Sequence, residues 1–220
     1  IFQLHREHGL FKDIPGQVIY NALSDAQLTQ TPPIFQAESP LRLGFLGRLD
    51  QVKGLDVLLR AAEILRLKSF PVQLILAGSG QPRDIQQWQM QYPALDIQWR
   101  GHIPPATLWP DIHALVFPSN SFEALGNVIL EAGAAARATI ASRHGGGVEL
   151  IDEGLSGAFF EPGNAKDLAN VIEGLHQRAG SWQEMGQHAY KKSRTFTSQR
   201  RVQAFENLCK DVLDAHHQLD

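Results

Sequence analysis

"LRLGFLGRLDQVKGLDVLLRAAEILRLK", residues 41–68, is the stretch that decides the fold. It begins with a short apolar run that ends at Gly47, which predicts a buried strand. It continues with Leu55, Leu58 and Leu65, whose spacing returns to the same face of a helix. A strand, a short loop and an amphipathic helix together form the repeating unit of an α/β sheet.

The same alternation continues toward the C-terminus. We expect the further strands at residues 72–80, 95–101, 113–119, 138–142 and 157–160. We expect the further helices at residues 82–91, 105–112, 125–136, 147–154, 164–179, 182–193 and 198–219. Asn164 is a suitable N-cap for one of them, because its side chain can accept a hydrogen bond from the first turn.

These strands are short and apolar on both faces, as buried parallel strands are. The prediction is therefore a Rossmann-like, doubly wound α/β fold, with a parallel sheet of about six strands and right-handed crossovers. Residues 1–22 suggest a helix followed by an extended piece, and residues 24–40 are polar and contain prolines. We divide the chain into a connector segment, residues 1–40, and a domain with C-terminal helices, residues 41–220.

The composition argues against several classes of protein. The chain has 220 residues and a net charge of -3, which does not favour a nucleic-acid binder. Cys209 is the only cysteine, so an internal disulfide is excluded and a cytoplasmic location is expected, with the membrane face as an alternative. No apolar run is long enough for a transmembrane segment, and no signal peptide is visible. The start at Ile1 suggests a piece of a longer protein.

Ligands of such sheets bind beyond the carboxyl ends of the strands, so residues directly after strands are the candidates. Arg48 and Lys53 lie in the loop after the first predicted strand, next to the start of a helix. Two cations beside a helix N-terminus can hold a doubly charged anion such as a diphosphate. The alternative is that both are solvated surface charges. The loop is not a Walker A motif, because the glycine spacing and the Ser/Thr after Lys are missing.

The segment "SFEALGNVILEA", residues 121–132, holds two glutamates. Glu123 lies in the turn after a strand, and Glu131 lies further along the next helix but can point back toward its N-terminus. We expect the helix to open with Leu125, Gly126, Asn127 and Val128, whose free N–H groups suit a phosphate. Each carboxylate can accept two hydrogen bonds from a diol, so one could hold a ribose and the other a sugar. The alternatives are helix-dipole complementarity for Glu123 and a surface salt bridge for Glu131.

A third cluster, "ASRHGGGVELIDEG", follows the predicted strand at residues 138–142. Its run of three glycines, residues 145–147, favours a structural turn over ligand contact. His144 is the one group in it that titrates near pH 7, and we interpret it as a bystander.

Taken together, these motifs resemble the C-terminal nucleotide-sugar-binding domain of the family 4 retaining glycosyltransferases, which have the two-domain GT-B architecture. The stretches that carry the resemblance are "GRLDQVKGLDVLLRA", "LILAGSG", "WRGHIP", "LVFPSNSFEALGNVILEA" and "GGGVELIDEGLSGAFFEPGNAKDLANVI". The match extends from Leu41 to Leu175. Two departures are Ala136 and Ala138, where the family usually has a glycine and a proline.

The resemblance implies roles for single residues. Arg48 and Lys53 would hold the donor diphosphate, Glu131 the ribose and Glu123 the transferred sugar. The backbone of residues 125–128 would contact sugar and phosphates, and the backbone near Ile103 the base. The resemblance also implies no metal and no other cofactor, because cationic side chains and the helix end supply the electrostatics. The partners would be a nucleotide-sugar donor, an acceptor that is a glycan, a lipid-linked or a small molecule, and an absent N-terminal domain.

Several functions remain open at this point. The leading one is the donor-binding half of a glycosyltransferase that retains the anomeric configuration, with the fragment inactive by itself. The alternatives are a nucleotide-sugar binding module without turnover and a nucleotide-sugar epimerase of the same architecture. An oxidoreductase ranks low, because no G-x-G-x-x-G follows the first strand.

Overall fold

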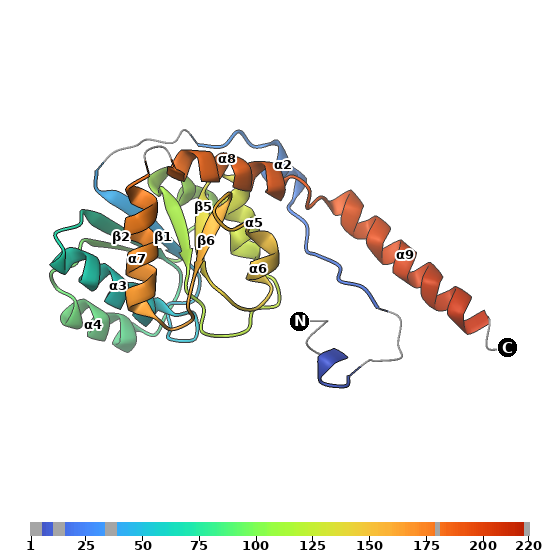
Figure 1. Ribbon diagram of the computed structural model, residues 1–220, viewed down its shortest axis with the longest axis horizontal. Coiled ribbons are helices and arrows are strands. Elements are labelled where there is room, and N and C mark those ends of the chain that lie inside the picture. Colours follow the sequence, from blue (N-terminus) through green and yellow to red (C-terminus); the bar gives the residue numbers. More distant parts are fainter. Residues whose placement is uncertain (1–5, 11–15, 34–38, 179–180, 218–220) are drawn as a thin grey trace.

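The computed structural model describes residues 6–10, 16–33, 39–178 and 181–217. Its centre is a parallel sheet of six strands in the order β3-β2-β1-β4-β5-β6 (Figure 1). The strands are β1 (Leu41–Leu46), β2 (Val72–Ala77), β3 (Ile97–Gly101), β4 (Ala114–Phe117), β5 (Ala138–Ser142) and β6 (Gly157–Phe160). The predicted fold class and the strand number are confirmed.

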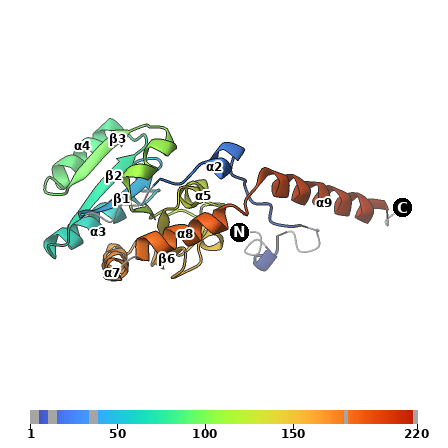
Figure 2. The same cartoon turned by 90° about the horizontal axis from the view of Figure 1, so that it is seen from above.

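Helices cover both faces of this sheet, as in a doubly wound fold (Figures 1 and 2). The described helices are α2 (Asp25–Thr29), α3 (Leu55–Leu67), α4 (Pro82–Gln91), α5 (Asn127–Ala134), α6 (Gly147–Leu150), α7 (Ala165–His176), α8 (Ser181–Ser193) and α9 (Ser198–His217). Of these, α9 projects away from the sheet in both views (Figures 1 and 2). The largest apolar cluster joins one face to α3, α4 and α7, and includes Leu43, Leu58 and Ile172. Two smaller clusters lie under α5 and α6 on the other face.

The strand order reverses between β1 and β4, because β1 is followed in the sheet by β2 on one side and by β4 on the other. In open α/β sheets, ligands bind beyond the carboxyl ends of the strands at such a reversal, so the loops after β1 and β4 are where a ligand is expected. The predicted anion-binding residues Arg48 and Lys53 lie in the loop after β1, and Glu123 lies in the loop after β4.

Two regions differ from the sequence predictions in their secondary structure: residues 105–112 and the connector. Residues 105–112 form two short 3₁₀ turns, Pro105–Thr107 and Trp109–Asp111, and not an α-helix, because Pro110 has no N–H to donate. The connector contains α2, whose N-terminus is capped by Ser24 and Gln27 in a reciprocal capping box. The helix expected at the start of the chain lies mostly outside the described residues.

Candidate functional site

The loops after β1 and β4 are locked together at the carboxyl edge of the sheet. Gly54, the N-cap of α3, has a left-handed φ of +73°, and a Cβ there would lie 1.7 Å from the carbonyl oxygen of Pro118. Only glycine permits both this backbone and this close approach. Asn120 adds two hydrogen bonds, from its N–H to the carbonyl of Val52 at 2.9 Å and from its amide to that of Gln51 at 2.8 Å.

This lock brings Lys53 against Glu123. The Lys53 ammonium forms an ion pair with Oε1 of Glu123, and both side chains are largely buried. The same oxygen accepts hydrogen bonds from the hydroxyls of Ser119 at 3.0 Å and Ser121 at 3.2 Å. Burial by itself would raise the pKa of Glu123, but the hydrogen bonds from Lys53 and the two serines outweigh it and lower that pKa. Glu123 is therefore held ionised.

Arg48 lies in the same loop but is much more open. Its side chain is 66% exposed, and its guanidinium lies 3.4 Å from the carboxylate of Asp50. Asp50 also accepts a hydrogen bond from the N–H of Lys53 at 2.8 Å, which shapes the turn that presents Lys53. Of the two predicted cations, Lys53 is held against Glu123 at the sheet edge. Arg48 is exposed and can move toward a ligand.

The helix start differs by two residues from the prediction. α5 begins at Asn127, Gly126 is its N-cap in a left-handed conformation, and Leu125 is buried before the helix. The exposed N-terminus therefore comprises the N–H groups of Asn127 and Val128. The side-chain oxygen of Asn127 accepts a hydrogen bond from the amide of Asn21 at 2.9 Å.

Glu131 lies one turn inside α5, on the same face as Asn127 by its spacing of four residues. Its carboxylate is partly buried, and burial raises its pKa. Within the described ranges, no hydrogen bond or ion pair reaches this carboxylate, so the surface salt bridge considered as an alternative is not formed there. A desolvated carboxylate without a partner is costly and is typical of a functional position.

The remaining predicted residues border the same edge. Ile103 follows β3, and both Ile103 and Val128 pack against the apolar cluster beneath β2 and β4. The glycine run of residues 145–147 packs on the Glu123 loop: the N–H of Gly146 donates to the carbonyl of Glu123 at 2.8 Å, and a Cβ on Gly146 would lie 2.0 Å from the carbonyl oxygen of Ala124. This close contact supports the structural interpretation of the glycine run.

Three residues of this edge were not among the predicted ones. Ser119 and Ser121 contact Glu123, and Asn21 contacts Asn127. The serines lie two and four residues before Glu123, so their position beside a carboxylate in a turn was a usable signal. Asn21 is 106 residues from Asn127 in sequence, and no local pattern indicates that pair.

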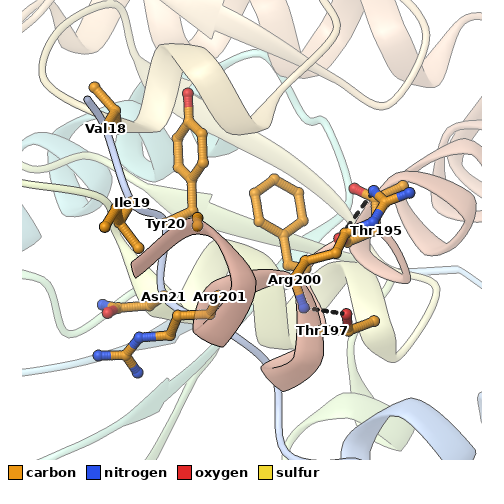
Figure 3. Close-up of a pocket in the computed structure, with 10 residues that line it drawn as sticks. Val18, Ile19, Tyr20, Asn21, Thr195, Thr197, Arg200 and Arg201 are labelled. Atoms are coloured by element: carbon orange, nitrogen blue, oxygen red, sulfur yellow. Dashed lines mark hydrogen bonds between the residues drawn. The ribbon is translucent and has the colours of Figure 1, made fainter. Parts of the chain in front are cut away.

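A separate cavity of about 270 Å³ lies between the N-terminal segment and the start of α9 (Figure 3). Its lining residues are Val18, Ile19, Tyr20, Asn21, Thr195, Phe196, Thr197, Arg200, Arg201 and Ala204. Asn21 thus faces this cavity and also contacts α5.

No group of three or more His, Cys, Asp or Glu side chains in the described part of the chain is arranged to hold a metal ion. Likewise, none of the helices described is both long enough and apolar enough to cross a bilayer.

Comparisons with known proteins identify the family of the chain. The family profile of the glycosyl transferases group 1 matches residues 40–178. A D-inositol 3-phosphate glycosyltransferase from Arthrobacter sp. (strain FB24) is 28% identical in an alignment of 211 positions, which covers 86% of this chain and 50% of the relative. The chain spans half or less of the length of the first curated relatives that it matches.

Solved structures share the fold. Sucrose-phosphate synthase from Thermosynechococcus elongatus superposes with a TM-score of 0.81 at 20% identity, over 97% of this chain and 57% of that one. Anabaena Alr3699/HepE, solved in complex with UDP and glucose, superposes with a TM-score of 0.68 at 21% identity, over 77% of this chain and 48% of that one. Such neighbours are GT-B glycosyltransferases. The sheet, the locked edge and the profile match over more than half of the sequence lead to one conclusion: this chain belongs to the group 1 glycosyltransferases.

Proposed function

We propose that this chain binds the nucleotide-sugar donor of a family 4 glycosyltransferase, which transfers the sugar to an acceptor with retention of the anomeric configuration. The observation that carries the proposal is the meeting of three features at one edge of the sheet. These are the Lys53–Glu123 pair, the exposed N-terminus of α5 and the partly buried Glu131 without a partner among the described residues.

The charges of this edge suit a diphosphate flanked by two hydroxyl-rich groups. Arg48, Lys53 and the N–H groups at the start of α5 provide the positive charge for the diphosphate. Glu131 accepts hydrogen bonds from the ribose, and Glu123 from the transferred sugar. Ile103 and the backbone of residues 125–128 line the remainder of the donor site.

The free state suggests how the donor enters. Lys53 neutralises Glu123 while the site is empty. The diphosphate carries two negative charges and competes for Lys53, so binding turns the Lys53 ammonium toward the phosphates. The three contacts of Glu123 all use Oε1, so Oε2, which has no partner among the described residues, is available to the sugar. During transfer, the same cations and the helix end stabilise the departing diphosphate, where negative charge develops.

The proposal assigns the whole reaction to a longer protein. The acceptor site and part of the active site belong to a further domain, so this chain alone binds donor and does not transfer sugar. The donor site works without a metal ion, and the protein acts in the cytoplasm. The Anabaena structure with UDP and glucose supports a nucleotide-sugar donor, because that protein shares the fold.

Calorimetric titration of this chain with UDP, GDP and ADP, and with the corresponding glucose conjugates, tests the donor site. We expect saturable binding of one nucleoside diphosphate and stronger binding of its sugar conjugate. Absence of binding to all of them contradicts the proposal. In the full-length enzyme, NMR of the product from an α-linked donor tests retention: an α-linked product supports it, and a β-linked product contradicts it.

A further inference from the structure

The N-terminal segment of residues 18–23, here called the strap, has no regular secondary structure and leads into α2 (Figure 1), and part of it lines the cavity in Figure 3. Leu23 anchors one end: its side chain is 3% exposed and packs in the apolar cluster of α5 and α6, and its N–H donates to the carbonyl of Phe196 at 2.9 Å. Tyr20 anchors the middle: its hydroxyl donates to the carboxylate of Glu149, and its ring meets that of Phe196 edge-to-face at 5.6 Å.

Between these two anchors, Asn21 reaches the start of α5. Its amide nitrogen donates to the side-chain oxygen of Asn127 at 2.9 Å. An asparagine side chain has one acceptor oxygen and one donor NH₂ group. Asn21 occupies one lone pair of the Asn127 oxygen and so orients the amide, and within the described residues no hydrogen bond uses the Asn127 NH₂, which remains for a ligand.

That remaining group matches the chemistry of the site. Asn127 is the first residue of α5, so its side chain branches from the same turn that carries the free backbone N–H groups of the helix N-terminus. All of these groups donate hydrogen bonds, and phosphate oxygens only accept them. If the Asn127 amide were turned the other way, it would present an oxygen to the phosphates and repel them.

We propose that Asn21 is a positioning residue of the donor site: it fixes the Asn127 side chain with its NH₂ toward the donor diphosphate. The strap is thereby part of the donor site, although it lies outside the sheet edge. This inference rests on the proposed donor site and adds a residue that acts on the ligand through Asn127.

Calorimetric titration with the diphosphate among UDP, GDP and ADP that the unaltered chain binds most tightly tests this inference. Asn21→Ala frees the Asn127 amide to rotate, so we expect the dissociation constant to rise roughly 2- to 5-fold, as for loss of one neutral hydrogen bond. Asn21→Asp places a side chain there that can only accept, so it turns the Asn127 amide around. We expect a larger rise than for Asn21→Ala, and little change for the nucleoside without phosphates with either variant.

The Asn21→Asp substitution also adds a negative charge. Comparing Asn21→Asp with Asn21→Ala in a chain that also carries Asn127→Ala separates the effect of this charge from the effect of reversing the Asn127 amide. We expect the difference between Asn21→Asp and Asn21→Ala to shrink when the Asn127 amide is absent. Gln17→Ala is the matched control, because Gln17 ties the same segment to the carbonyl of Ala204 in α9 without touching α5. It should leave the affinity unchanged, and all variants should melt close to the unaltered chain.

Each other outcome overturns the inference. Three results reject positioning through Asn127 while the donor site stands: equal affinity in Asn21→Ala and the unaltered chain, a difference between the two Asn21 variants that persists in the Asn127→Ala background, or an equal loss in Gln17→Ala. If the unaltered chain binds none of the three diphosphates, the donor site itself fails and the inference falls with it.

Discussion

The loop that carries Glu123 and the helix that carries Glu131 lie at the same edge of the sheet and present the same functional group in opposite states. Glu123 is paired with Lys53, hydrogen-bonded to two serines and held ionised with a lowered pKa. Glu131 is partly buried, has no partner in the described structure, and burial raises its pKa. One region is assembled before a ligand arrives, and the other keeps an unsatisfied acceptor.

The two carboxylates therefore affect stability with opposite signs. The folded-state pKa of Glu123 lies below its ordinary value of 4.5, so its stabilisation is present above that value and is lost as the pH falls through the lowered pKa. The folded-state pKa of Glu131 lies above 4.5, so the ionised group destabilises the fold at neutral pH. That cost is relieved as the pH falls through the raised pKa. A group that costs stability when empty is best explained by a ligand that satisfies it.

The largest expected effect comes from breaking the lock that assembles the first region. Gly54→Ala should lower the free energy of unfolding by roughly 1–3 kcal/mol from the left-handed backbone alone, and the contact with Pro118 adds to this. Urea denaturation measures it. Gly174→Ala is the matched control, because a Cβ there meets nothing within 4 Å and the residue lies inside α7; it should be neutral or stabilising. Equal losses in both variants would show that the close approach at Gly54 is unimportant.

The next largest effect tests whether Lys53 binds a phosphate in addition to its ion pair with Glu123. Lys53→Ala should weaken binding of a nucleoside diphosphate by about 1.5–3 kcal/mol, the range for charged hydrogen bonds. It should also raise the pKa of Glu123, because the hydrogen bond and charge that lower it are lost. Arg48→Ala should act in the same direction on binding. Calorimetry measures the affinity, with Lys68→Ala as control, since Lys68 pairs with Glu173 away from the edge.

Binding of the nucleoside without phosphates shows whether Lys53 acts on the phosphates or on the structure of the site. This binding should change little when Lys53 is removed. An equal loss of affinity for the nucleoside and for the diphosphate would mean that Lys53 supports the site only through its structure.

A smaller effect concerns the raised pKa of Glu131. If the ionised carboxylate accepts the ribose hydroxyls, nucleoside affinity should fall as the pH falls through that pKa, which lies above 4.5. The decrease should begin at a higher pH than the ordinary value of a glutamate predicts. Glu131→Gln should bind weakly with no such pH dependence, and should be more stable than the unaltered chain at neutral pH. Affinity that is constant across this range in the unaltered chain argues against a ribose contact.

The last prediction is that removing metal ions has no effect on binding of the nucleoside diphosphate. We predict that a chelator leaves the affinity for the nucleoside diphosphate unchanged, because Arg48, Lys53 and the start of α5 supply the positive charge. Titrations with and without EDTA measure this. A loss of affinity that added magnesium restores would show that a metal ion bridges the phosphates.

The fold was largely readable from the sequence, because buried parallel strands are continuous apolar runs. The predicted ranges 138–142 and 82–91 coincide with β5 and α4. The short helix α2 was missed because a polar, proline-containing stretch hid the capping signal of Ser24 and Gln27. Ala136 stands where the family usually has glycine, and its φ of +53° gives the reason: this turn requires a left-handed residue.

The site was only partly predictable from the sequence, because its residues are far apart in the chain and the order of the strands brings them together. Lys53 and Glu123 are 70 residues apart, and they meet because β1 and β4 are neighbours in the sheet. The motifs predicted both side chains as site residues, but not that the two pair with each other in the absence of a ligand. The same holds for Asn21, whose contact with Asn127 depends on the path of the strap.

The measurement that tests the central claim most directly is a calorimetric comparison of Glu123→Ala and Glu131→Ala with a nucleoside diphosphate and with its sugar conjugate. The division of roles predicts that Glu131→Ala weakens both ligands. It predicts that Glu123→Ala weakens the nucleotide-sugar and leaves the nucleoside diphosphate nearly unaffected. A Glu123→Ala variant that loses equal affinity for both ligands, or a Glu131→Ala variant that loses affinity for neither, would contradict it.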